Sequence, residues 1–552
     1  MAGACGPAPG MFSDDPLFDP GWILEVRLEL DPADWDALRF QGRSFEDLIG
    51  ANCLEKPFSD PFTYFPAEAI IDGMRVSNVG VRKKCFFGSC DEERPALKIS
   101  FNKFVRGQRF FGLRRLTLNN CKQDPSKIRQ CLGYWLFRRA GLPAPRCNFA
   151  HVIVNGKDLG IYAHIESIGL EFLARNFYAS GGNLYEGSLS DFRPEWVGTF
   201  QKKTNLESPD RSDLQALVQA CALNDEEFLP ALERLVDVEQ FYSFWAMEVI
   251  TGHWDGYAGN TNNFYLYRHP ADGRFRFIPW GNDGTLALIG PPEESINMVM
   301  AQGILANRLY RLPETRKIYV ERLEHLLDEI WRVEDILTQI DGMEQLISPY
   351  ADSYHTGELA AHINGVRDFV RLNPEAVRAE IASGPPDWNQ PLREPICFEQ
   401  IGSARATFET TWESIRSPDP FSPGRGTLEV TANGQNYQFA AVAAVAGIDP
   451  NPQASPAEPL VQIIGVVPGP PNDTLLLVQV VIHDPRLITS GGRVPLDVEK
   501  AFGIVFHYDP ASNPGRVVGL LLLGELNFTQ ASLQPGAALS GELSSPITES
   551  AW

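Results

Sequence analysis

The character of the sequence changes after about residue 385, and this change constrains the fold more than any other feature. Apolar residues recur at helical spacing from about 210 to 383, whereas 426–552 contain short apolar runs separated by Pro, Gly, Asn and Asp. One pair of runs turns at Asn433-Gly434, which is typical of a β-hairpin. Short strands at regular spacing without helices between them indicate a β-sandwich. At 552 residues the chain also exceeds the roughly 250–300 residues of a single core, so we expect at least two domains.

Four segments are expected from this pattern. Residues 1–20 are rich in Gly, Pro and Asp and predict a flexible tether. Residues 21–385 are expected to form an α+β domain, with a β-rich N-terminal part and a helical C-terminal part. The Pro- and Ser-rich stretch 386–425 predicts a linker, and residues 426–552 predict an all-β, sandwich-like domain.

Local patterns sharpen the first domain. Asp124-Pro125 precede apolar residues at helical spacing, which predicts a helix that Asp124 caps. The run VEQFYSFWAMEVI predicts a buried helix that stops before Gly252. Two aromatic-rich runs around Asp272-Gly273 predict a β-hairpin directly behind it.

The charge of the chain excludes two classes of partner. Lys and Arg number 48 against 70 Asp and Glu, which gives a net charge of −22. Binding to nucleic acid or to an anionic membrane needs a basic face, so we expect neither from this composition. No apolar run approaches the roughly 18–20 residues of a membrane-spanning helix, so no transmembrane segment is expected.

Nine cysteines, eight of them before residue 222, show no CxxC pair and no zinc spacing with histidine. Buried free thiols are the simplest interpretation, above all for Cys131 and Cys221, which fall in helical patterns. Disulfide bonds of an exported protein are the alternative for three of the nine: Cys85, Cys90 and Cys121.

One group of residues has the order of a catalytic site. The chain has no GxxxxGK[ST] loop, no GxSxG elbow, no HExxH and no Rossmann fingerprint. Behind the buried helix stand Asp255, Asn260 and Asn263, followed by the hairpin and then by Asp283. A carboxylate, an asparagine five residues on, a hairpin and a second carboxylate is the order of parts in a protein-kinase site. The alternative is a turn-rich loop whose Asn and Asp side chains cap their own backbone.

The surrounding sequence resembles the CotH family of spore-coat and secreted kinase-like proteins. The resemblance rests on HWDGYAGNTNNFYLYRHPADGRFRFIPW and on three earlier blocks: PALKISF, LNN followed by DPS, and VNGKDLGIY. It runs in the family's order from about 22 to 383. It implies an atypical protein-kinase-like fold without the usual glycine loop. It also implies transfer of the ATP γ-phosphoryl group to Ser or Thr of exported proteins.

The resemblance assigns roles by position. Asp255 corresponds to the catalytic base, and Asn263, directly before the aromatic strand, to a metal ligand. Spacing from Asp255 would instead favour Asn260, because the loop is longer than usual for the family. The family typically has Asp after the Pro-Trp pair, where this chain has Gly281. Asp283 matches a second acidic position and would then bind the metal; the alternative is a degraded site in a pseudokinase.

Four charged residues are expected beside the nucleotide. Lys98 is expected to bind the ATP phosphates, and it shares one face of its strand with Arg94, which the family pattern also permits in this role. Arg129 lies off the apolar stripe of its helix and is expected to face the phosphates. Glu166 matches an acidic position of the family and is expected to pair with the lysine or to lie near the nucleotide. A strand edge or solvated surface is the alternative for each.

Two classes of function follow. The first is an exported Ser/Thr kinase-like enzyme that uses ATP and Mg²⁺ or Mn²⁺ on an unnamed protein acceptor, with transfer of AMP as a variant. The second is a non-catalytic pseudokinase that serves as a surface-binding or structural protein, which Gly281 favours. Cys5 in AGACG resembles the end of a bacterial lipobox, so we expect a bacterial extracellular or cell-envelope protein with a lipid anchor at Cys5.

Overall fold

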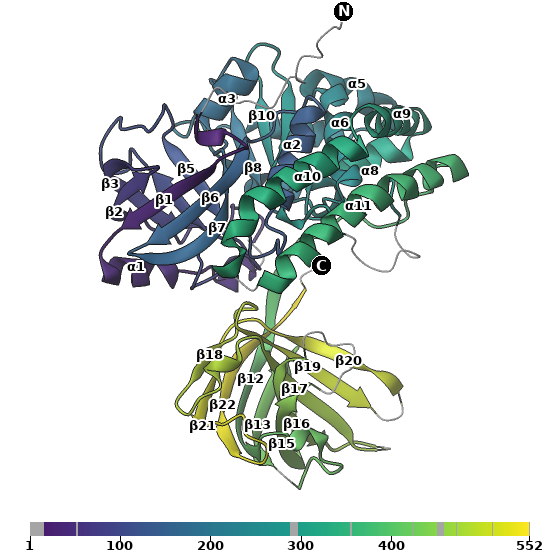
Figure 1. The fold of residues 1–552 in the computed structure, drawn as a ribbon. Helices are drawn as coiled ribbons and strands as arrows, with labels where there is room; N and C mark the ends of the chain where they lie inside the picture. Colours follow the sequence, from purple (N-terminus) through teal and green to yellow (C-terminus); the bar gives the residue numbers. More distant parts are fainter. Residues whose placement is uncertain are drawn as a thin grey trace, which may run out of the picture. The chain divides into compact units, whose positions relative to one another are not determined.

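The computed structural model describes residues 16–50, 53–287, 296–353, 356–422, 424–449, 457–470, 472–509 and 512–550. Contacts divide the chain into two compact units. The first unit extends to Arg43 and again from Leu54 to Glu394, and the second takes in Ser44–Cys53 and the chain from Pro395 onward (Figure 1). The predicted class, α+β with a separate β-rich C-terminal part, is confirmed.

The first unit begins with a closed barrel whose strand order is β1-β2-β3-β4-β5-β7-β6. Parallel pairing of β1 with β6 closes it, and inward side chains such as Val26, Val81 and Ile99 are fully buried in its core. Because side chains alternate along a strand, the residues between these project from the outside of the barrel. The strands are β1 (Ile23–Glu29), β2 (Phe65–Ile71), β3 (Met74–Lys83), β4 (Leu97–Ser100), β5 (Arg115–Asn119), β6 (Cys147–Val154) and β7 (Lys157–Ile165).

Helices and one small sheet make up the rest of the first unit (Figure 1). The sheet has the order β11-β10-β8-β9, and β10 with β11 is the predicted hairpin. Its strands are β8 (Leu184–Gly187), β9 (Gln201–Lys202), β10 (Phe264–Arg268) and β11 (Phe275–Pro279). The helices are α1 (Pro32–Arg39), α2 (Arg129–Arg139), α3 (Leu170–Phe177), α4 (Ser212–Ala222), α5 (Asp225–Leu235), α6 (Val238–Ile250), α7 (Tyr257–Asn260), α8 (Ile304–Arg311), α9 (Pro313–Glu329), α10 (Val333–Ile347) and α11 (Thr356–Ser383). No helix in the described ranges is both long and apolar enough to cross a membrane.

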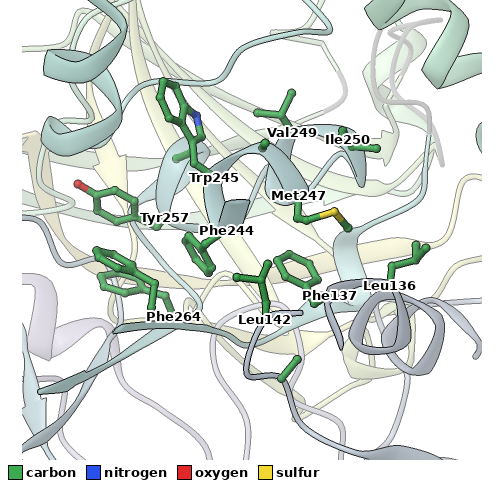
Figure 2. Close-up of a cluster of buried hydrophobic side chains, with 14 of the residues drawn as sticks. Leu136, Phe137, Leu142, Phe244, Trp245, Met247, Val249, Ile250, Tyr257 and Phe264 are labelled. Atoms are coloured by element: carbon green, nitrogen blue, oxygen red, sulfur yellow. The ribbon is translucent and has the colours of Figure 1, made fainter. Parts of the chain in front are cut away.

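Helix α6 lies at the centre of the helical core (Figure 2). The Trp245 ring of this helix stacks on the Tyr319 ring of α9, with ring centroids 3.8 Å apart. The centroid of the Phe241 ring lies 4.7 Å from that of Phe277 in β11. Packing on several sides explains why most residues of α6 are apolar, as expected for the predicted buried helix. The helix therefore fixes the loop that follows it, which contains Asp255.

The second unit is one curled sheet of order β14-β13-β12-β22-β20-β19-β17-β16-β15, which forks at β22 toward β21. Strands β12 and β13 pack against β15, so the sheet folds over its own core in a sandwich-like manner. The turn at Asn433-Gly434 has φ of 51° and 74°, as a two-residue hairpin requires. The strands are β12 (Phe398–Thr411), β13 (Arg425–Ala432), β14 (Gln435–Asn436), β15 (Ala441–Ile448), β16 (Pro459–Val467), β17 (Thr474–Ile482), β18 (Arg493–Pro495), β19 (Ala501–Asp509), β20 (Ser512–Leu521), β21 (Glu525–Gln530) and β22 (Ala538–Ser550).

Three local features differ from the sequence-based expectation. The stretch 386–425, expected to be a linker, contains β12, whose buried face consists largely of small residues such as Ala404 and Ala406 and so gives a weak apolar signal. The end of the expected tether is folded, with Leu17 and Phe18 buried in a 3₁₀ turn. Helix α2 begins at Arg129 rather than at Pro125, and the Asp124 carboxylate accepts a hydrogen bond from the Arg129 amide at 2.9 Å. Cys5 lies outside the described residues.

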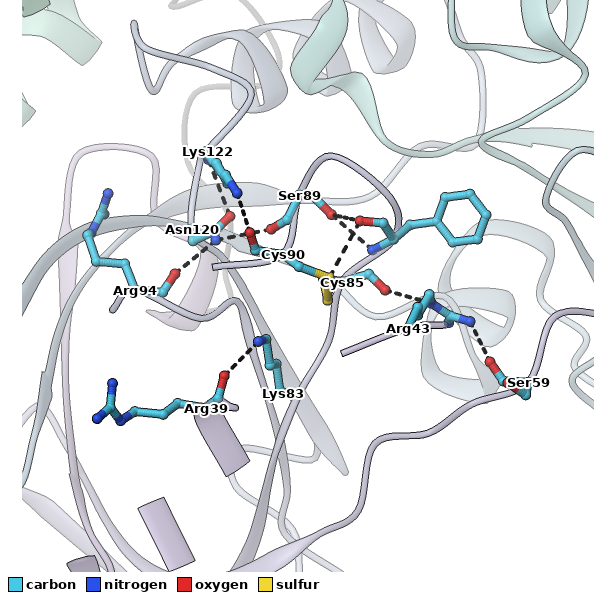
Figure 3. The surroundings of a disulfide bond; sticks show 11 residues. Arg39, Arg43, Ser59, Lys83, Cys85, Ser89, Cys90, Arg94, Asn120 and Lys122 are labelled. Carbon is cyan, nitrogen blue, oxygen red and sulfur yellow. Dashed lines mark hydrogen bonds between the residues drawn. A yellow bond between two sulfur atoms is a disulfide. The ribbon is translucent and has the colours of Figure 1, made fainter. Parts of the chain in front are cut away.

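Disulfide bonds join Cys53 to Cys397, Cys85 to Cys90, and Cys131 to Cys147. The Cys85–Cys90 bond closes the loop behind β3, where Arg43 donates to the Cys85 carbonyl at 2.9 Å and Asn120 donates to the Arg94 carbonyl at 2.8 Å (Figure 3). The prediction of disulfide bonding is confirmed for Cys85 and Cys90 and wrong for Cys121, which is a buried free thiol. The free-thiol prediction is confirmed for Cys221 and wrong for Cys131, because β6 brings Cys147 beside α2.

Thiol titration of denatured, unreduced protein produced without a lipid at Cys5 should therefore give three thiols per chain. Six of the nine cysteines are in disulfide bonds, which leaves Cys121 and Cys221 together with Cys5. After reduction the same titration should give nine, which serves as the control; a lipid at Cys5 would lower both counts by one. Nine thiols before reduction would contradict the bonded state and with it the inference of an oxidising compartment.

Candidate active site

A buried carboxylate holds the loop that carries Asp255. Glu248 of α6 is fully buried and accepts hydrogen bonds from the amides of Tyr257 at 2.9 Å and Ala258 at 2.8 Å. Burial raises the pKa of Glu248 to about 8, and these two bonds act against the shift. A Cβ at Gly256 would lie 2.3 Å from the Glu248 carboxylate, so glycine permits this approach. The contacts fix the start of α7.

Asp255 lies among asparagine amides. Its carboxylate accepts hydrogen bonds from Nδ2 of Asn260 at 2.6 Å, Asn262 at 3.2 Å and Asn263 at 2.6 Å. Burial raises the pKa of Asp255, while the three amides act in the opposite direction. Asn263, the predicted metal ligand, and Asn260, the alternative that the spacing favoured, thus contact the same carboxylate.

His253 ties this loop to the turn behind β11. The histidine is fully buried, and its Nε2 lies 3.0 Å from the Trp280 carbonyl. Burial lowers the pKa of His253 to about 4, so the ring is neutral at pH 7 and donates its Nε2 proton to this carbonyl. The Asn263 carbonyl accepts the Trp280 amide at 3.0 Å, which gives a second link between the two segments.

Asp283 lies in the 3₁₀ turn Asn282–Gly284 that follows β11. Its carboxylate accepts a hydrogen bond from Asn119 Nδ2 at 3.4 Å. Burial raises its pKa, and the negative charge of Asp255 raises it further, while the positive charge of Lys84 lowers it. The charge of Asp255 thus acts on the pKa of Asp283, and the metal role of Asp283 stays a prediction.

Gly281 has a structural reason to be glycine. Its φ is 56°, in the left-handed region, and a Cβ there would lie 2.3 Å from Asn263 Oδ1. The Asn263 amide, which also contacts Asp255, thus occupies the space that a side chain at 281 would need. A side chain at 281 and the present position of the Asn263 amide therefore exclude each other.

Basic residues gather on the outer face of the barrel. Lys98 of β4 pairs in register with Arg82 and Thr117, so its side chain projects from the same face as theirs. Burial lowers the pKa of Lys98 well below its ordinary range, and the charge of Lys203 lowers it further. Lys84 follows β3 on this face, with Nζ 5.4 Å from the centre of the Trp280 ring. Burial lowers the pKa of Lys84 as well, although the charge of Asp283 acts against it.

The small sheet supplies Lys203 and one matching acid. Lys203 Nζ lies 2.7 Å from the Glu186 carboxylate of β8. Burial would raise the pKa of Glu186, but the Lys203 charge, the hydrogen bonds with Lys203 and Tyr265 and the Lys98 charge together lower it to about 2. We define the lysine cluster as Lys84, Lys98 and Lys203. Three crowded, partly desolvated ammonium groups are typical of a site for a polyanion.

Three predicted residues have other partners. Arg94 donates to the carbonyls of Leu159 at 2.8 Å and Ile161 at 2.9 Å, and Glu166 forms ion pairs with two arginines, Arg146 and Arg175. Burial would raise the pKa of Glu166, but the arginine charges outweigh it and lower the pKa. The structure thus does not pair Glu166 with Lys98. Arg129 lies 3.6 Å from Asp124. The charge of Asp283 helps to raise the pKa of Asp124, so Arg129 lies near the Asp283 end of the site.

Several residues of the site were missed by the sequence analysis: His253, Glu248, Lys84, Lys203 and Glu186. Glu248 had a usable signal, because it is a carboxylate in an otherwise apolar helix. Lys203 and Glu186 had none, since their meeting depends on the pairing of β8 with β9.

The donor set fits a magnesium or manganese nucleotide. Mg²⁺ is usually held by one or two carboxylates, with phosphate oxygens and water as the other ligands. The carboxylate of Asp283 and the amide oxygen of Asn263 are donors of this kind, and Asp255 adds negative charge beside them. The described part of the chain has no group of three or more His, Cys, Asp or Glu that could hold a metal alone, so the phosphates would have to supply ligands. The lysine cluster matches those phosphates in charge.

Comparison with known proteins relates the chain to one protein family. The family model described as CotH kinase protein matches residues 86–377. Inner spore coat protein H of Bacillus subtilis is 28% identical over 272 residues, which cover 46% of this chain and 74% of that protein. Invasin CotH7 of Rhizopus delemar is 21% identical over 367 residues, which cover 61% of this chain and only 56% of the fungal protein. A solved structure of the proinflammatory kinase CtkA from Helicobacter pylori matches 52% of this chain and 94% of its own, with 10% identity and a TM-score of 0.28. The match of the family model over more than half of the residues shows that the chain belongs to the CotH family.

Proposed function

We propose that the chain transfers the γ-phosphoryl group of ATP to Ser or Thr of an exported or envelope protein, with Mg²⁺ or Mn²⁺. One observation carries the proposal. The lysine cluster meets the Asp255 loop at Trp280, because Lys84 Nζ lies 5.4 Å from the Trp280 ring and the Trp280 backbone bonds to Asn263 and His253. The charges of Lys84 and Asp255 both act on the pKa of Asp283. A polyanion site next to a carboxylate that can accept a proton is the arrangement that phosphoryl transfer needs.

The residues have separable roles under this proposal. Asp255 would orient the acceptor hydroxyl and accept its proton, and the asparagine amides fix the direction of its carboxylate. Lys98, Lys84 and Lys203 would bind phosphate oxygens. Asp283 and Asn263 would hold the divalent ion, which when bound neutralises charge on the phosphates. Burial of Asp255 raises its pKa, so activity should be lost at a higher pH than for an exposed carboxylate as the pH falls.

A non-catalytic pseudokinase is the second candidate, and Gly281 favours it. Where the family has a carboxylate, this chain has no side chain and places the Asn263 amide against the glycine. Transfer of AMP is the third, because the same phosphate site could hold the nucleotide in another direction. Intact mass after incubation with ATP distinguishes the outcomes: added phosphate, added AMP or no change.

Export rests on independent observations. The disulfide bonds favour an oxidising compartment, and relatives carry the names spore coat protein and invasin. We therefore propose an extracellular or envelope location, with the lipid anchor at Cys5 as a further proposal.

Thermal unfolding with ATP and Mg²⁺ or Mn²⁺ tests the nucleotide site. Ligand at about 100 times its Kd should stabilise the native protein by about 2.7 kcal/mol and raise the melting temperature. Lys98→Ala should remove most of this shift, because it deletes the cation buried deepest in the lysine cluster. Lys157→Ala is the matched control, since Lys157 is exposed and pairs with Glu93 on the surface. An unchanged melting temperature of the wild-type protein at millimolar nucleotide would contradict the proposal.

A further inference from the structure

The segment 384–394, which we call the strap, lies beyond the last residue that the family model matches and still belongs to the first unit. It follows α11 without regular secondary structure and ends one residue before the second unit. Its half-buried Arg393 contacts the loop that carries Asp255 directly through its side chain. Two backbone hydrogen bonds of Arg393 connect it to the same loop through other residues.

The first contact is through the side chain. Arg393 Nε donates to Asn260 Oδ1 at 2.7 Å, and the same amide donates through Nδ2 to Asp255 Oδ1 at 2.6 Å. Because an amide has one donor end and one acceptor end, the arginine fixes which end faces Asp255. Asn260 is thus oriented as a donor toward the carboxylate.

The other two contacts use the backbone of Arg393. Its amide donates to the Gln302 carbonyl at 2.9 Å, and the Gln302 amide donates to the Ala258 carbonyl of α7 at 2.8 Å. Its carbonyl accepts a hydrogen bond from Arg193, whose Nε lies 3.2 Å from Asp191. The backbone of Arg393 is thus linked to α7 through Gln302 and to Asp191 through Arg193.

Asp191 completes the network. It is fully buried and accepts hydrogen bonds from the Tyr257 hydroxyl at 3.1 Å and the Ile304 amide at 3.1 Å. Tyr257 is the first residue of α7, and Glu248 holds its amide from the opposite side. Both ends of the α7 turn are therefore held by groups that connect to Arg393 or to Glu248.

We propose that Arg393 is a positioning residue for Asp255 and that the strap is part of the catalytic unit. The kinetic consequences of this inference rest on the proposed function. The positioning of the loop by Arg393 does not depend on it. The functional unit then ends near residue 394, well beyond the end of the family match at 377.

The test compares Arg393→Ala, Arg393→Lys and Asp387→Asn in the full chain. Asp387→Asn is the matched control, because it breaks the exposed Arg316–Asp387 pair, which joins the same strap to α9 rather than to α7. We expect Arg393→Ala to lower kcat about 10- to 100-fold, as a displaced catalytic group does, with KM for ATP within about twofold. Arg393→Lys keeps the charge and one donor group and should recover part of kcat.

Hydrogen exchange supplies a readout without activity. The Asn260 and Thr261 amides bond within α7, and in Arg393→Ala they should exchange about tenfold faster than in Asp387→Asn. If Arg393→Ala matches the control in kcat and exchange, the inference is overturned. If the wild type transfers no phosphoryl group, the proposed function fails, and the exchange comparison alone then decides whether Arg393 positions the loop.

Discussion

Replacing Asp255 with asparagine should lower kcat by about 10²–10⁴-fold, equivalent to about 3–5 kcal/mol, while the affinity for ATP stays near wild type. The carboxylate accepts three amide donors, and an amide at this position would oppose them with donors of its own and could not take up a proton. Phosphate incorporation into the chain or into a Ser/Thr-rich acceptor protein measures kcat. Thermal-shift titration with ATP and Mn²⁺ measures the affinity.

Asp272→Asn is the matched control for this experiment. Asp272 lies in the turn between β10 and β11 and pairs with Arg274 and Arg276. The variant therefore removes a carboxylate from the hairpin that follows the Asp255 loop, at a position outside the site. It should keep wild-type kcat. An Asp255→Asn protein with wild-type turnover would show that the carboxylate only organises its loop.

Replacing Asp283 with asparagine should weaken metal-dependent nucleotide binding by at least about tenfold, because it removes a charge held directly against the ion. Binding of ATP without metal should change little, since the lysine cluster remains. Titrating Mg²⁺ or Mn²⁺ against the ATP-dependent melting shift gives the effect. The contrast with Asp255→Asn is the informative result, because one variant loses turnover and the other loses metal affinity first.

Adding the family's carboxylate should not restore an Asp283→Asn protein. In Asp283→Asn combined with Gly281→Asp, the new Cβ would lie 2.3 Å from Asn263 Oδ1 and would force that amide away from Asp255. We expect the double variant to bind metal no better than Asp283→Asn. Recovery of metal affinity would show that Asn263 moves freely. An Asp283→Asn protein with wild-type metal titration would mean that the carboxylate only caps its turn.

The loop motif could be predicted because its parts are close in sequence. Asp255, Asn260 and Asn263 fall within nine residues, and the hairpin that follows brings Asp283 back toward them. The charged residues farther away could not be assigned so easily. Arg94 and Glu166 have the expected residue types, but each has another partner in the structure. Arg94 bonds to the Leu159 carbonyl and Glu166 pairs with Arg146, and only the fold brings these groups together.

The strand β12 shows a second limit of the sequence. Alanines alternate along much of its buried face, and small side chains mark a strand only weakly, so the segment resembled a linker. The strand pairs with β13 and β22 over nearly its whole length, so long-range pairing rather than local propensity determines its structure. The hairpin turn at Asn433-Gly434, by contrast, needed no partner to be identified.

The segment Ser44–Cys53 has a consequence for how the protein is made. It belongs to the second unit although the first unit flanks it on both sides, and it is bonded to β12 and its neighbourhood through the Gly50–Phe398 hydrogen bond and the Cys53–Cys397 disulfide. During synthesis Cys53 emerges 344 residues before its partner, while Cys85 and Cys90 appear soon after it. Correct oxidation must therefore wait until Cys397 has been made or be reached by exchange from an early, wrong pairing. Maturation of this chain should depend on a disulfide isomerase more than the number of its bonds would suggest.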